Sequence, residues 1–454
     1  MNDINEALFK AYDIRGIYSK DLDENTAEIV GRAFGSYIGK DKRVVIGLDV
    51  RNSSRTLMNH MLKGMGESGL KIFDIGVVPT PVVYFTIVHY GFDGGAMVTA
   101  SHNPKEWNGF KLFGTKGAVL GLGSGLEKIR DIARNGSFQV FESPDVEDIS
   151  QKILSDYESF LLGKVKIGRK LRIGVDPGNG CYSGIASRIL SKSGLEVLPI
   201  NNEPDGNFSS RAPEPKADTI TQLMKLVKEH GLDFGVAFDS DGDRAIFVDE
   251  NGAFIRGDIA FAAFVKSLLS NGEKAVYEVS CSKSVEEEIL KKGGIPILSR
   301  TGRAFILNTM SKENARLGGE IAGHLYFSEI YNADDALYAT LKMAELLSAK
   351  NTTLSKLISE IPKYSTKALE IDVDDKYKYN IIDKLRENLG KKEKNLITID
   401  GVKITLTNGW FLLRASNTSP KIRLVAEAST DEDLDSVVSK AMLEFNLALD
   451  EVSK

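Results

Sequence analysis

The chain is arranged around the stretch Met97-Val98-Thr99-Ala100-Ser101-His102-Asn103-Pro104, which continues through Asn108-Gly109-Phe110-Lys111. Its short apolar run predicts a buried strand that ends abruptly in small and polar residues, before a proline that cannot extend a ladder. Ser101 is therefore expected at the carboxyl tip of a strand, the edge where open α/β sheets bind their ligands. A Ser-Asn-Pro turn capped by its own side chains fits the same residues equally well, so the rest of the chain must decide.

Strand and helix patterns alternate on both sides of this stretch. Apolar strands at 44–48 and 71–75 alternate with helical patterns before it, and the alternation restarts with strands at 171–176 and 275–279. Such alternation predicts parallel pairing with helices on both faces of a sheet. After residue 366 the strands cluster, which is typical of a smaller α+β unit.

The predicted fold class is therefore α/β, with three consecutive α/β units and a C-terminal α+β domain around a central cleft. The sheets of the three units should be mixed and mainly parallel. A chain of 454 residues is too long for one ordinary domain. We predict four domains, at residues 1–146, 147–253, 254–365 and 366–454, each with one polar motif at a strand or loop end.

Composition excludes several classes of protein. The net charge of -5 argues against a dedicated nucleic-acid binder, which would normally be basic. The chain contains no run of about 18 apolar residues, which a membrane-spanning helix would need. Residues 1–10 lack the apolar core of a signal peptide. Cys181 and Cys281 have no metal-type spacing and indicate a reducing compartment. We expect a cytoplasmic protein that binds neither nucleic acid nor membrane.

The most specific motif is Asp239-Ser240-Asp241-Gly242-Asp243-Arg244, directly after an apolar strand. Carboxylates at every second position form a hard oxygen cluster suited to a divalent cation. A helix-flanked calcium loop would need glycine where this chain has Arg244, and the flanking residues here read as strands. The predicted ion is Mg²⁺, which commonly shares its coordination with substrate phosphates; a solvated acidic turn is the plain alternative.

Two further polar loops follow strands. Arg414-Ala415-Ser416-Asn417-Thr418, with Arg423 close behind, combines two guanidinium forks with hydroxyl and amide donors, a set that fits a phosphate dianion. Gly319-Glu320-Ile321-Ala322-Gly323-His324 offers one carboxylate and one imidazole, and such a carboxylate can accept hydrogen bonds from paired sugar hydroxyls. Either loop taken alone could be a surface turn.

Together the motifs resemble those of the α-D-phosphohexomutase superfamily, and most closely its phosphomannomutase/phosphoglucomutase branch. They occur in the family's order and span nearly the whole chain. Tyr12-Asp13-Ile14-Arg15-Gly16 matches the family's N-terminal motif, and Lys111 matches its lysine after the serine loop. The resemblance implies an enzyme that interconverts hexose 1-phosphate and 6-phosphate through a phosphoserine and a hexose 1,6-bisphosphate intermediate. It also implies Mg²⁺ and a hexose 1,6-bisphosphate activator as cofactors, sugar phosphates as ligands, and a monomer or homodimer.

The resemblance further implies a role for each motif. Ser101 would carry the phosphoryl group, and Mg²⁺ would be held by an oxygen of that serine with Asp239, Asp241 and Asp243. The catalytic set would be Ser101, Arg15, His102, Lys111 and His324, of which the last three are candidates for proton transfer. The substrate-binding set would be Tyr12, Arg244, Gly302, Arg303, Glu320, Ala322, Arg414, Ser416, Asn417, Thr418 and Arg423.

Two departures from the family pattern concern the sugar. Ala322 stands where the family usually has serine, and the loop Ser299-Arg300-Thr301-Gly302-Arg303 replaces a Thr-x-Val-Gly motif that ends in His, Asp or Lys. The preference between mannose and glucose therefore stays open. Phosphoglucosamine mutase is an alternative, although its sugar loop typically carries Gln where Ile321 stands. A noncatalytic sugar-phosphate-binding protein is another, but it predicts loss of the serine or an aspartate, and all are present.

Overall fold

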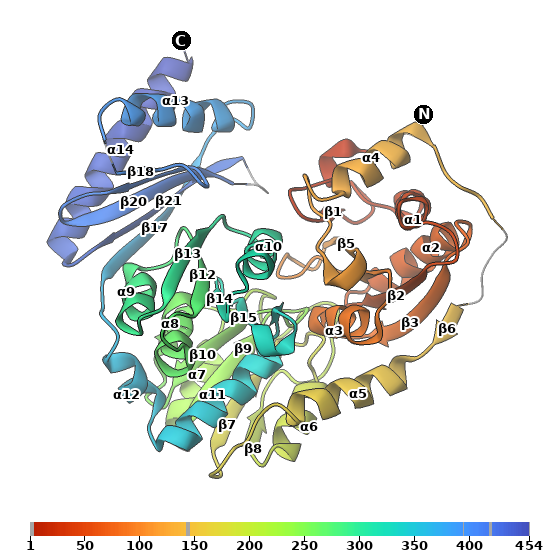
Figure 1. The fold of residues 1–454 in the computed structure, drawn as a ribbon, viewed down its shortest axis with the longest axis horizontal. Helices are drawn as coiled ribbons and strands as arrows, with labels where there is room; N and C mark the ends of the chain where they lie inside the picture. The colour runs from red at the N-terminus through yellow and green to blue at the C-terminus, as the bar shows by residue number, and fades with distance from the viewer. Residues whose placement is uncertain (1–3, 142–145, 394, 417–419, 454) are drawn as a thin grey trace.

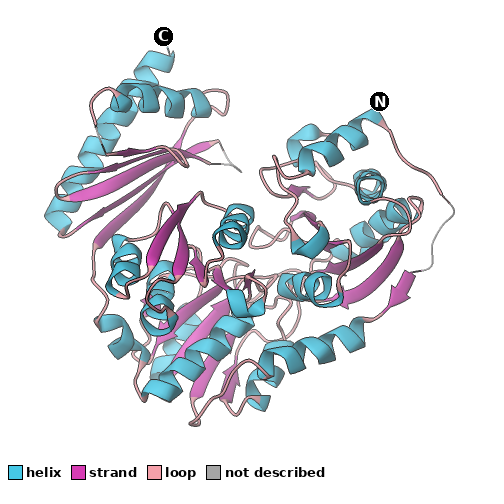
Figure 2. Ribbon diagram, viewed as in Figure 1, coloured by secondary structure: helices cyan, strands magenta, loops and turns pink. Residues whose placement is uncertain are grey.

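Four β-sheets follow one another along the chain in a computed structural model that describes residues 4–141, 146–393, 395–416 and 420–453. In Figure 1 the first sheet lies on the right, the fourth at the upper left, and the second and third lie below and between them. Strands and helices alternate in the first three sheets, whereas the fourth has both of its helices packed together (Figure 2). The predicted α/β class is confirmed.

The first sheet holds the serine loop, which is residues 99–106. Its elements are β1 (Ile14–Ile17), α1 (Glu24–Ile38), β2 (Arg43–Leu48), α2 (Ser54–Gly66), β3 (Lys71–Val77), α3 (Thr80–Tyr90), β4 (Gly94–Val98), β5 (Trp107–Phe113), α4 (Leu126–Asn135) and β6 (Val146–Asp148). The strand order is β1-β5-β4-β2-β3-β6, and β4 pairs parallel with β2 but antiparallel with β5. Ser101 thus follows the carboxyl end of β4 and lies in the connection that turns the chain back into β5. The sequence pattern did not predict β1 and β5. β5 runs opposite to β4 with no helix between them, and β1 joins the sheet beside β5, so neither continues the β-α-β alternation.

The second sheet holds the aspartate loop, which is residues 239–244. Its elements are α5 (Ser150–Leu162), β7 (Arg172–Asp176), α6 (Ile185–Lys192), β8 (Glu196–Pro199), α7 (Thr221–His230), β9 (Phe234–Phe238), β10 (Ala245–Asp249) and β11 (Phe254–Ile255). β10 and β11 pair antiparallel as a hairpin. β9 is completely buried and pairs parallel with β7 on one side and antiparallel with β10 on the other. Asp239 follows its last residue directly, so the three carboxylates lie where β9 turns back into β10.

The third sheet holds the glycine-flanked loop. Its elements are α8 (Gly257–Leu268), β12 (Lys274–Glu278), α9 (Lys283–Lys291), β13 (Ile295–Ser299), α10 (Arg303–Glu313), β14 (Leu317–Gly319), β15 (Leu325–Phe327), β16 (Ala333–Asp334), α11 (Ala336–Lys350) and α12 (Leu354–Ser359). β12 pairs parallel with β13 and β14, and β14 pairs antiparallel with β15. Glu320 and His324 lie in the tight turn between β14 and β15. Each of the first three sheets therefore combines parallel and antiparallel pairs.

The fourth sheet is antiparallel. Its elements are β17 (Ser365–Asp372), α13 (Lys378–Gly390), β18 (Leu396–Ile397), β19 (Val402–Thr405), β20 (Gly409–Ala415), β21 (Lys421–Ala428) and α14 (Asp431–Ser453), in the strand order β17-β21-β20-β19-β18. Its own apolar core lies between the sheet and the two helices. It contacts the third sheet where Lys403 donates a hydrogen bond of 2.8 Å to the carbonyl of Val279, above the ring of Trp410.

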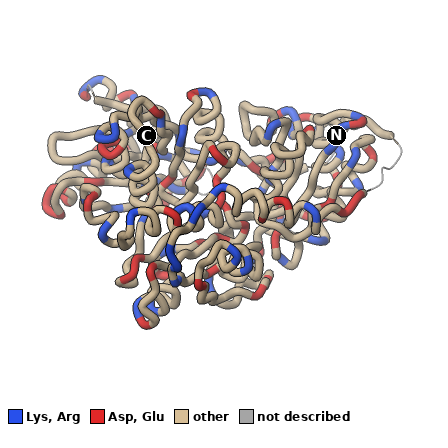
Figure 3. Tube along the Cα trace, turned by 60° about the horizontal axis from the view of Figure 1, so that its bottom comes forward, with Lys and Arg blue, Asp and Glu red and all other residues tan. Residues whose placement is uncertain are grey.

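Charged residues are spread over the molecule. Figure 3 shows basic and acidic residues interspersed along the chain trace. Among the described residues, no helix is long and apolar enough to cross a membrane.

Candidate active site

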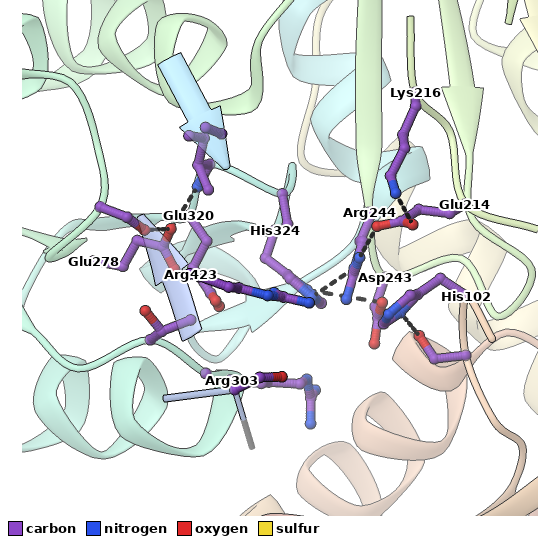
Figure 4. A pocket seen from close by; sticks show the side chains of 18 of the residues that line it. His102, Glu214, Lys216, Asp243, Arg244, Glu278, Arg303, Glu320, His324 and Arg423 are labelled. Atoms are coloured by element: carbon purple, nitrogen blue, oxygen red, sulfur yellow. Dashed lines mark hydrogen bonds and ion pairs between the residues drawn. The ribbon is translucent and has the colours of Figure 1, made fainter. Parts of the chain in front are cut away.

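The loops of all four sheets line one cavity of about 530 Å³. Figure 4 shows charged side chains from several of these loops pointing toward one another across it. The predicted site residues that line it are Tyr12, Arg15, Ser101, His102, Lys111, Asp243, Arg244, Gly302, Arg303, Glu320, Ala322, His324, Arg414, Ser416 and Arg423. Asp239 and Asp241 lie just behind the wall, and Asn417 and Thr418 fall outside the described residues.

Ser101 has a left-handed backbone with φ of 50°. A non-glycine residue in this conformation costs about 1–2 kcal/mol and persists only where its surroundings impose it. The Oγ atom lies 3.2 Å from Oδ2 of Asp239 and 3.3 Å from Nδ1 of His102. The hydroxyl is thus held between a carboxylate and an imidazole at the edge of the cavity.

Asp239, Asp241 and Asp243 form a buried cluster in which one carboxylate oxygen of each residue lies within 4.8 Å of the others. Oδ1 of Asp241 and Oδ1 of Asp243 are both buried, with no hydrogen-bond partner among the described residues. Buried carboxylate oxygens need a partner, because desolvating them unpaired is costly. Three hard oxygen donors with two unpaired oxygens fit a divalent cation such as Mg²⁺.

Electrostatics ties this cluster to Lys111, whose Nζ lies 2.6 Å from Oδ2 of both Asp241 and Asp243. Burial acts to lower the pKa of Lys111, but the two carboxylates raise it above its ordinary value, so the amine keeps its proton. Burial, and then the charges of Asp243 and Asp241, raise the pKa of Asp239 well above its usual range. Without added positive charge, the cluster therefore favours a proton on Asp239.

Arg15 enters the cavity from β1. Its Nη1 donates to Oδ1 of Asn103 at 2.8 Å, and its Nη2 donates to Asp13 at 2.5 Å. Gly109 allows β1 to approach β5 here, because a Cβ at that position would lie 2.1 Å from the carbonyl oxygen of Ile14. The position of Arg15 beside the serine loop thus depends on one glycine of β5.

His324 is bonded on both sides of its ring. Nδ1 lies 2.8 Å from Oδ2 of Asp334, and Nε–H of Arg244 points to Nε2 at 2.9 Å. Burial acts to lower the pKa of His324, but Asp243 and other carboxylates raise it above its usual value. Because Nε2 accepts a hydrogen bond from Arg244, the geometry fits a neutral ring with its proton on Nδ1. Arg303 completes the chain by donating from Nε to both oxygens of Asp334, at 2.7 and 2.8 Å.

His102 differs from His324 in its surroundings. Burial, followed by the charges of Arg244 and Arg15, lowers the pKa of His102 well below its usual value. The ring is therefore neutral near pH 7 and can accept or share a proton next to Ser101.

Glu320 and Glu278 provide two carboxylates on the sugar-loop side of the cavity (Figure 4). Glu320 accepts a short hydrogen bond from the hydroxyl of Tyr326. Glu278, the last residue of β12, accepts hydrogen bonds through Oε1 from Ser280 and from the backbone N–H of Ile321. Ala322 adds no hydrogen-bonding side chain to this wall.

Arg414 and Arg423 lie opposite each other on β20 and β21. The guanidinium of Arg414 makes no hydrogen bond to another described residue and lines the cavity, whereas Nε of Arg423 lies 3.3 Å from Glu370. Ser416 closes the strand pair with a backbone hydrogen bond of 2.9 Å to Lys421. Two neighbouring guanidinium groups, of which that of Arg414 has no hydrogen-bond partner among the described residues, can bind an anion such as phosphate.

Sequence reasoning missed two residues of this site, Asp334 and Glu278. A signal for Glu278 existed, because it is the one acidic residue within the apolar run 275–279 and ends β12. Asp334 carried none, since β16 is only two residues long and its packing against His324 is a tertiary contact.

Comparison with known proteins gives a consistent result along the chain. The alpha/beta/alpha domains I, II and III described as phosphoglucomutase/phosphomannomutase match residues 6–140, 154–252 and 256–364. The C-terminal domain of the same description matches residues 369–443. The four matches follow one another in order and together cover most of the chain.

Full-length relatives agree with these matches. A phosphomannomutase/phosphoglucomutase of Pseudomonas putida is 34% identical over 439 residues, which are 95% of this chain and 94% of that protein. A phosphomannomutase of Methanocaldococcus jannaschii is 35% identical over 443 residues, covering 95% of this chain and 96% of its own. The crystal structure of a phosphoglucomutase/phosphomannomutase family protein from Burkholderia thailandensis superimposes with a TM-score of 0.89 at 31% identity, covering 99% of this chain and 98% of that one.

The pH dependence of stability tests the Glu278 environment. Burial, and next the charge of Glu320, raise the pKa of Glu278 to about 7. The folded state thus favours the protonated carboxyl, so its contribution to stability is present at pH 4 and is lost as the pH rises toward 7. Relative to the natural protein, Glu278→Gln should be more stable at pH 8 by on the order of 1–3 kcal/mol and nearly equal at pH 5. Urea denaturation at the two pH values measures this difference.

A half-exposed carboxylate beside the same cavity is the matched control. The hydrogen bond from Lys421 lowers the pKa of Glu370, so Glu370→Gln should show no gain at pH 8. A Glu278→Gln variant that is less stable than the natural protein at pH 8 would contradict the electrostatic description.

Proposed function

The chain belongs to the phosphoglucomutase/phosphomannomutase family, and we propose that its Ser101 is the phosphoryl carrier in the interconversion of hexose 1-phosphate and hexose 6-phosphate. The observation that carries this proposal is the position of Ser101 Oγ, 3.2 Å from a buried aspartate cluster and at the edge of a four-sided cavity. A hydroxyl so placed can hold a phosphoryl group and pass it to a sugar bound in the cavity.

The proposed reaction has two phosphoryl transfers. A hydroxyl of the sugar phosphate attacks the phosphorus of phosphorylated Ser101, the bond from phosphorus to Oγ breaks, and a hexose 1,6-bisphosphate forms. The bisphosphate turns over in the cavity, and Oγ then attacks its other phosphorus, which restores phosphoserine and releases the isomeric monophosphate. A hexose 1,6-bisphosphate supplied from outside would prime the unphosphorylated serine, which is its role as activator.

Positive charge around Ser101 is the main source of rate in such a site, because charge spreads over the oxygens of the transferring group. Asp239, Asp241 and Asp243 would hold Mg²⁺, which when bound supplies charge neutralisation to the phosphoryl group. Lys111 keeps its proton and Arg15 faces the serine loop, so both add fixed positive charge.

We assign His324 as the group that accepts the proton of the attacking sugar hydroxyl. Asp334 holds Nδ1–H and would stabilise the imidazolium, as a carboxylate does for a catalytic histidine. The attacking hydroxyl would take the position at Nε2 that Arg244 now occupies. His102 would orient Oγ of Ser101, since it is neutral and 3.3 Å away.

Substrate binding would divide between phosphate and sugar. Arg414 and Arg423, with Ser416, Asn417 and Thr418, would grip the phosphate that is not being transferred. Since either phosphate of the intermediate can be left over, a charge-based grip that ignores the sugar suits both halves of the reaction. Glu320 would accept hydrogen bonds from sugar hydroxyls, with Tyr12, Arg244, Gly302, Arg303 and Ala322 as the surrounding wall.

The domain boundaries at 146, 253 and 365 stay predictions, as does the choice between monomer and homodimer. All residues assigned here come from one chain, so one copy carries a complete site. We infer that mannose and glucose phosphates are both substrates, because Ile321 and Ala322 offer no side-chain hydrogen bond to the hydroxyl at C2. Phosphoglucosamine mutase activity is the second candidate, and the same surface would have to accept an amino group at C2.

Ser101→Ala tests the phosphoryl carrier. After incubation with glucose 1,6-bisphosphate and Mg²⁺, intact-mass spectrometry should show one added phosphoryl group on the natural protein and none on the variant. Turnover should be lost because no other residue is assigned to carry the group. Ser280→Ala, which removes another serine of the cavity wall, should still gain one phosphoryl group. Full turnover by Ser101→Ala would refute the proposal.

Asp241→Asn tests the metal site by a measurement that does not depend on turnover. Mg²⁺ should stabilise the natural protein against heat, by about 2.7 kcal/mol at one hundred times its Kd, because it relieves repulsion among three buried carboxylates. The variant should lose most of this stabilisation, together with kcat. Asp372→Asn, whose side chain is 87% exposed, is the control and should respond to Mg²⁺ like the natural protein. Undiminished activity in excess chelator would exclude a required metal.

The apolar side chains of Ile321 and Ala322 predict weak discrimination between sugars that differ at C2. Values of kcat/KM for mannose 1-phosphate and glucose 1-phosphate should lie within about tenfold of each other, since an apolar surface rejects a misplaced hydroxyl weakly. Ala322→Ser adds one hydroxyl and should change this ratio by no more than about tenfold, the value of one hydrogen bond. A thousandfold preference, or a preference for glucosamine 1-phosphate over both, would show that another element reads C2.

A further inference from the structure

Arg51 lies beneath the serine loop and is almost completely buried, with 2% of its surface exposed. A guanidinium group has five N–H donors, and each of the five is used here. Nε donates to Oδ2 of Asp49 at 3.0 Å. The other four donors lie within 2.6–3.1 Å of main-chain carbonyl oxygens, those of Ser101, Asn103 and Pro104 in the serine loop and that of Trp107 at the start of β5.

The carbonyls of Ser101, Asn103 and Pro104 lie in the connection from β4 to β5, which forms no helix or strand ladder of its own, and the carbonyl of Trp107 lies at the start of β5. All four converge on one cation, so the shape of the loop follows the shape of the planar guanidinium. A lysine could not replace it, since an ammonium group has three donors and no fork geometry.

Asp49 helps to fix the backbone N–H of Ser101, as Arg51 fixes its carbonyl. Its Oδ2 accepts a hydrogen bond of 2.7 Å from the hydroxyl of Thr99, and that hydroxyl accepts one of 2.9 Å from the N–H of Ser101. Arg51 meanwhile holds the Ser101 carbonyl at 2.6 Å, and Ser240 of the aspartate loop donates to the same oxygen at 2.5 Å. The main chain of Ser101 is therefore fixed at both its N–H and its C=O, which explains how its left-handed φ is maintained.

Arg51 does not line the cavity. The ring of Phe208, from the second α/β unit, covers its guanidinium at 5.0 Å. The hydrogen bonds of Arg51 therefore reach the reaction through the serine loop, and its charge, which Arg51→Lys keeps, also acts on Asp241 and Arg15. We propose that Arg51 is a positioning residue that sets the place and direction of Ser101 Oγ for both phosphoryl transfers, an inference that rests on the proposed role of Ser101.

This role predicts a specific kinetic signature. A misplacement of about 1 Å in a reacting group can lower a rate by about a hundredfold, whereas the groups proposed to bind substrate do not contact Arg51. Arg51→Lys should therefore lower kcat at least about tenfold and leave KM within about threefold. The rate at which glucose 1,6-bisphosphate loads Ser101, followed by intact mass in the full-length protein with Mg²⁺, should fall by the same factor as kcat.

Leu57→Ala is the control for loss of stability alone. Leu57 is fully buried on α2 in the apolar core that also holds residues of β2 and β4, and its hydrocarbon side chain can form no hydrogen bond to the serine loop. The variant should unfold at a lower temperature and, assayed below that temperature, should keep the kcat of the natural protein.

Chemical rescue separates positioning from folding more sharply. Arg51→Ala leaves a cavity of the shape of the lost group, so millimolar guanidinium chloride should restore part of its kcat, while the same concentration of sodium chloride should not. Asp49→Asn keeps the volume but weakens the anchor of Nε, so it should lower kcat by a smaller factor than Arg51→Lys. It also provides a readout if Arg51→Ala fails to fold.

The inference is overturned if Arg51→Lys keeps the natural kcat, if its loss falls on KM, or if Leu57→Ala loses kcat equally. Ser101→Ala distinguishes this failure from failure of the proposed function. An inactive Ser101→Ala beside a fully active Arg51→Lys would refute positioning only, whereas an active Ser101→Ala would refute the carrier itself.

Discussion

Charge balance around three buried aspartates is the constraint on which the rest of the structure depends. One carboxylate oxygen from each of Asp239, Asp241 and Asp243 lies within 4.8 Å of the others at the end of a buried strand, where water cannot screen their repulsion. Lys111 of the first sheet and Arg244 supply positive charge, and the ring Nδ1 of His324 from the third sheet lies 3.7 Å from Asp243. The aspartates therefore draw polar groups from three different sheets to one place. The same arrangement would suit the proposed cation and phosphoryl group.

Around this centre, the molecule separates fixed groups from adaptable ones. Ser101 and its loop are tied to Arg51 and Asp49, so the oxygen that we propose to react has little freedom. The guanidinium of Arg414 makes no hydrogen bond to another described residue, which would suit its proposed role of holding whichever phosphate is left over. The proposed reaction needs a fixed phosphoryl donor together with a phosphate-binding group that does not distinguish the sugar, because one intermediate is used in two orientations.

Much of this was predictable from sequence, because the decisive residues follow apolar strands. The strands before Ser101 and Asp239 were visible as apolar runs, and the carboxyl ends of such strands meet at one edge of a sheet. β1 and β5 were not predicted, because β5 turns back on β4 without an intervening helix and β1 pairs beside β5, so neither belongs to the β-α-β alternation. Asp334 and Arg51 were missed for a different reason. Their roles lie in contacts with His324 and with four carbonyl groups, and no local pattern encodes a tertiary contact.

The central claim is that the phosphoryl group leaves the enzyme through Ser101 in every turnover, and a single-turnover transfer experiment measures this directly. Protein carrying radioactive phosphate on Ser101 would be mixed rapidly with unlabelled mannose 1-phosphate and Mg²⁺, then quenched at short times. The account predicts that label moves from protein to sugar phosphate at a rate at least equal to kcat. Label that remains on the protein while unlabelled mannose 6-phosphate accumulates would contradict it.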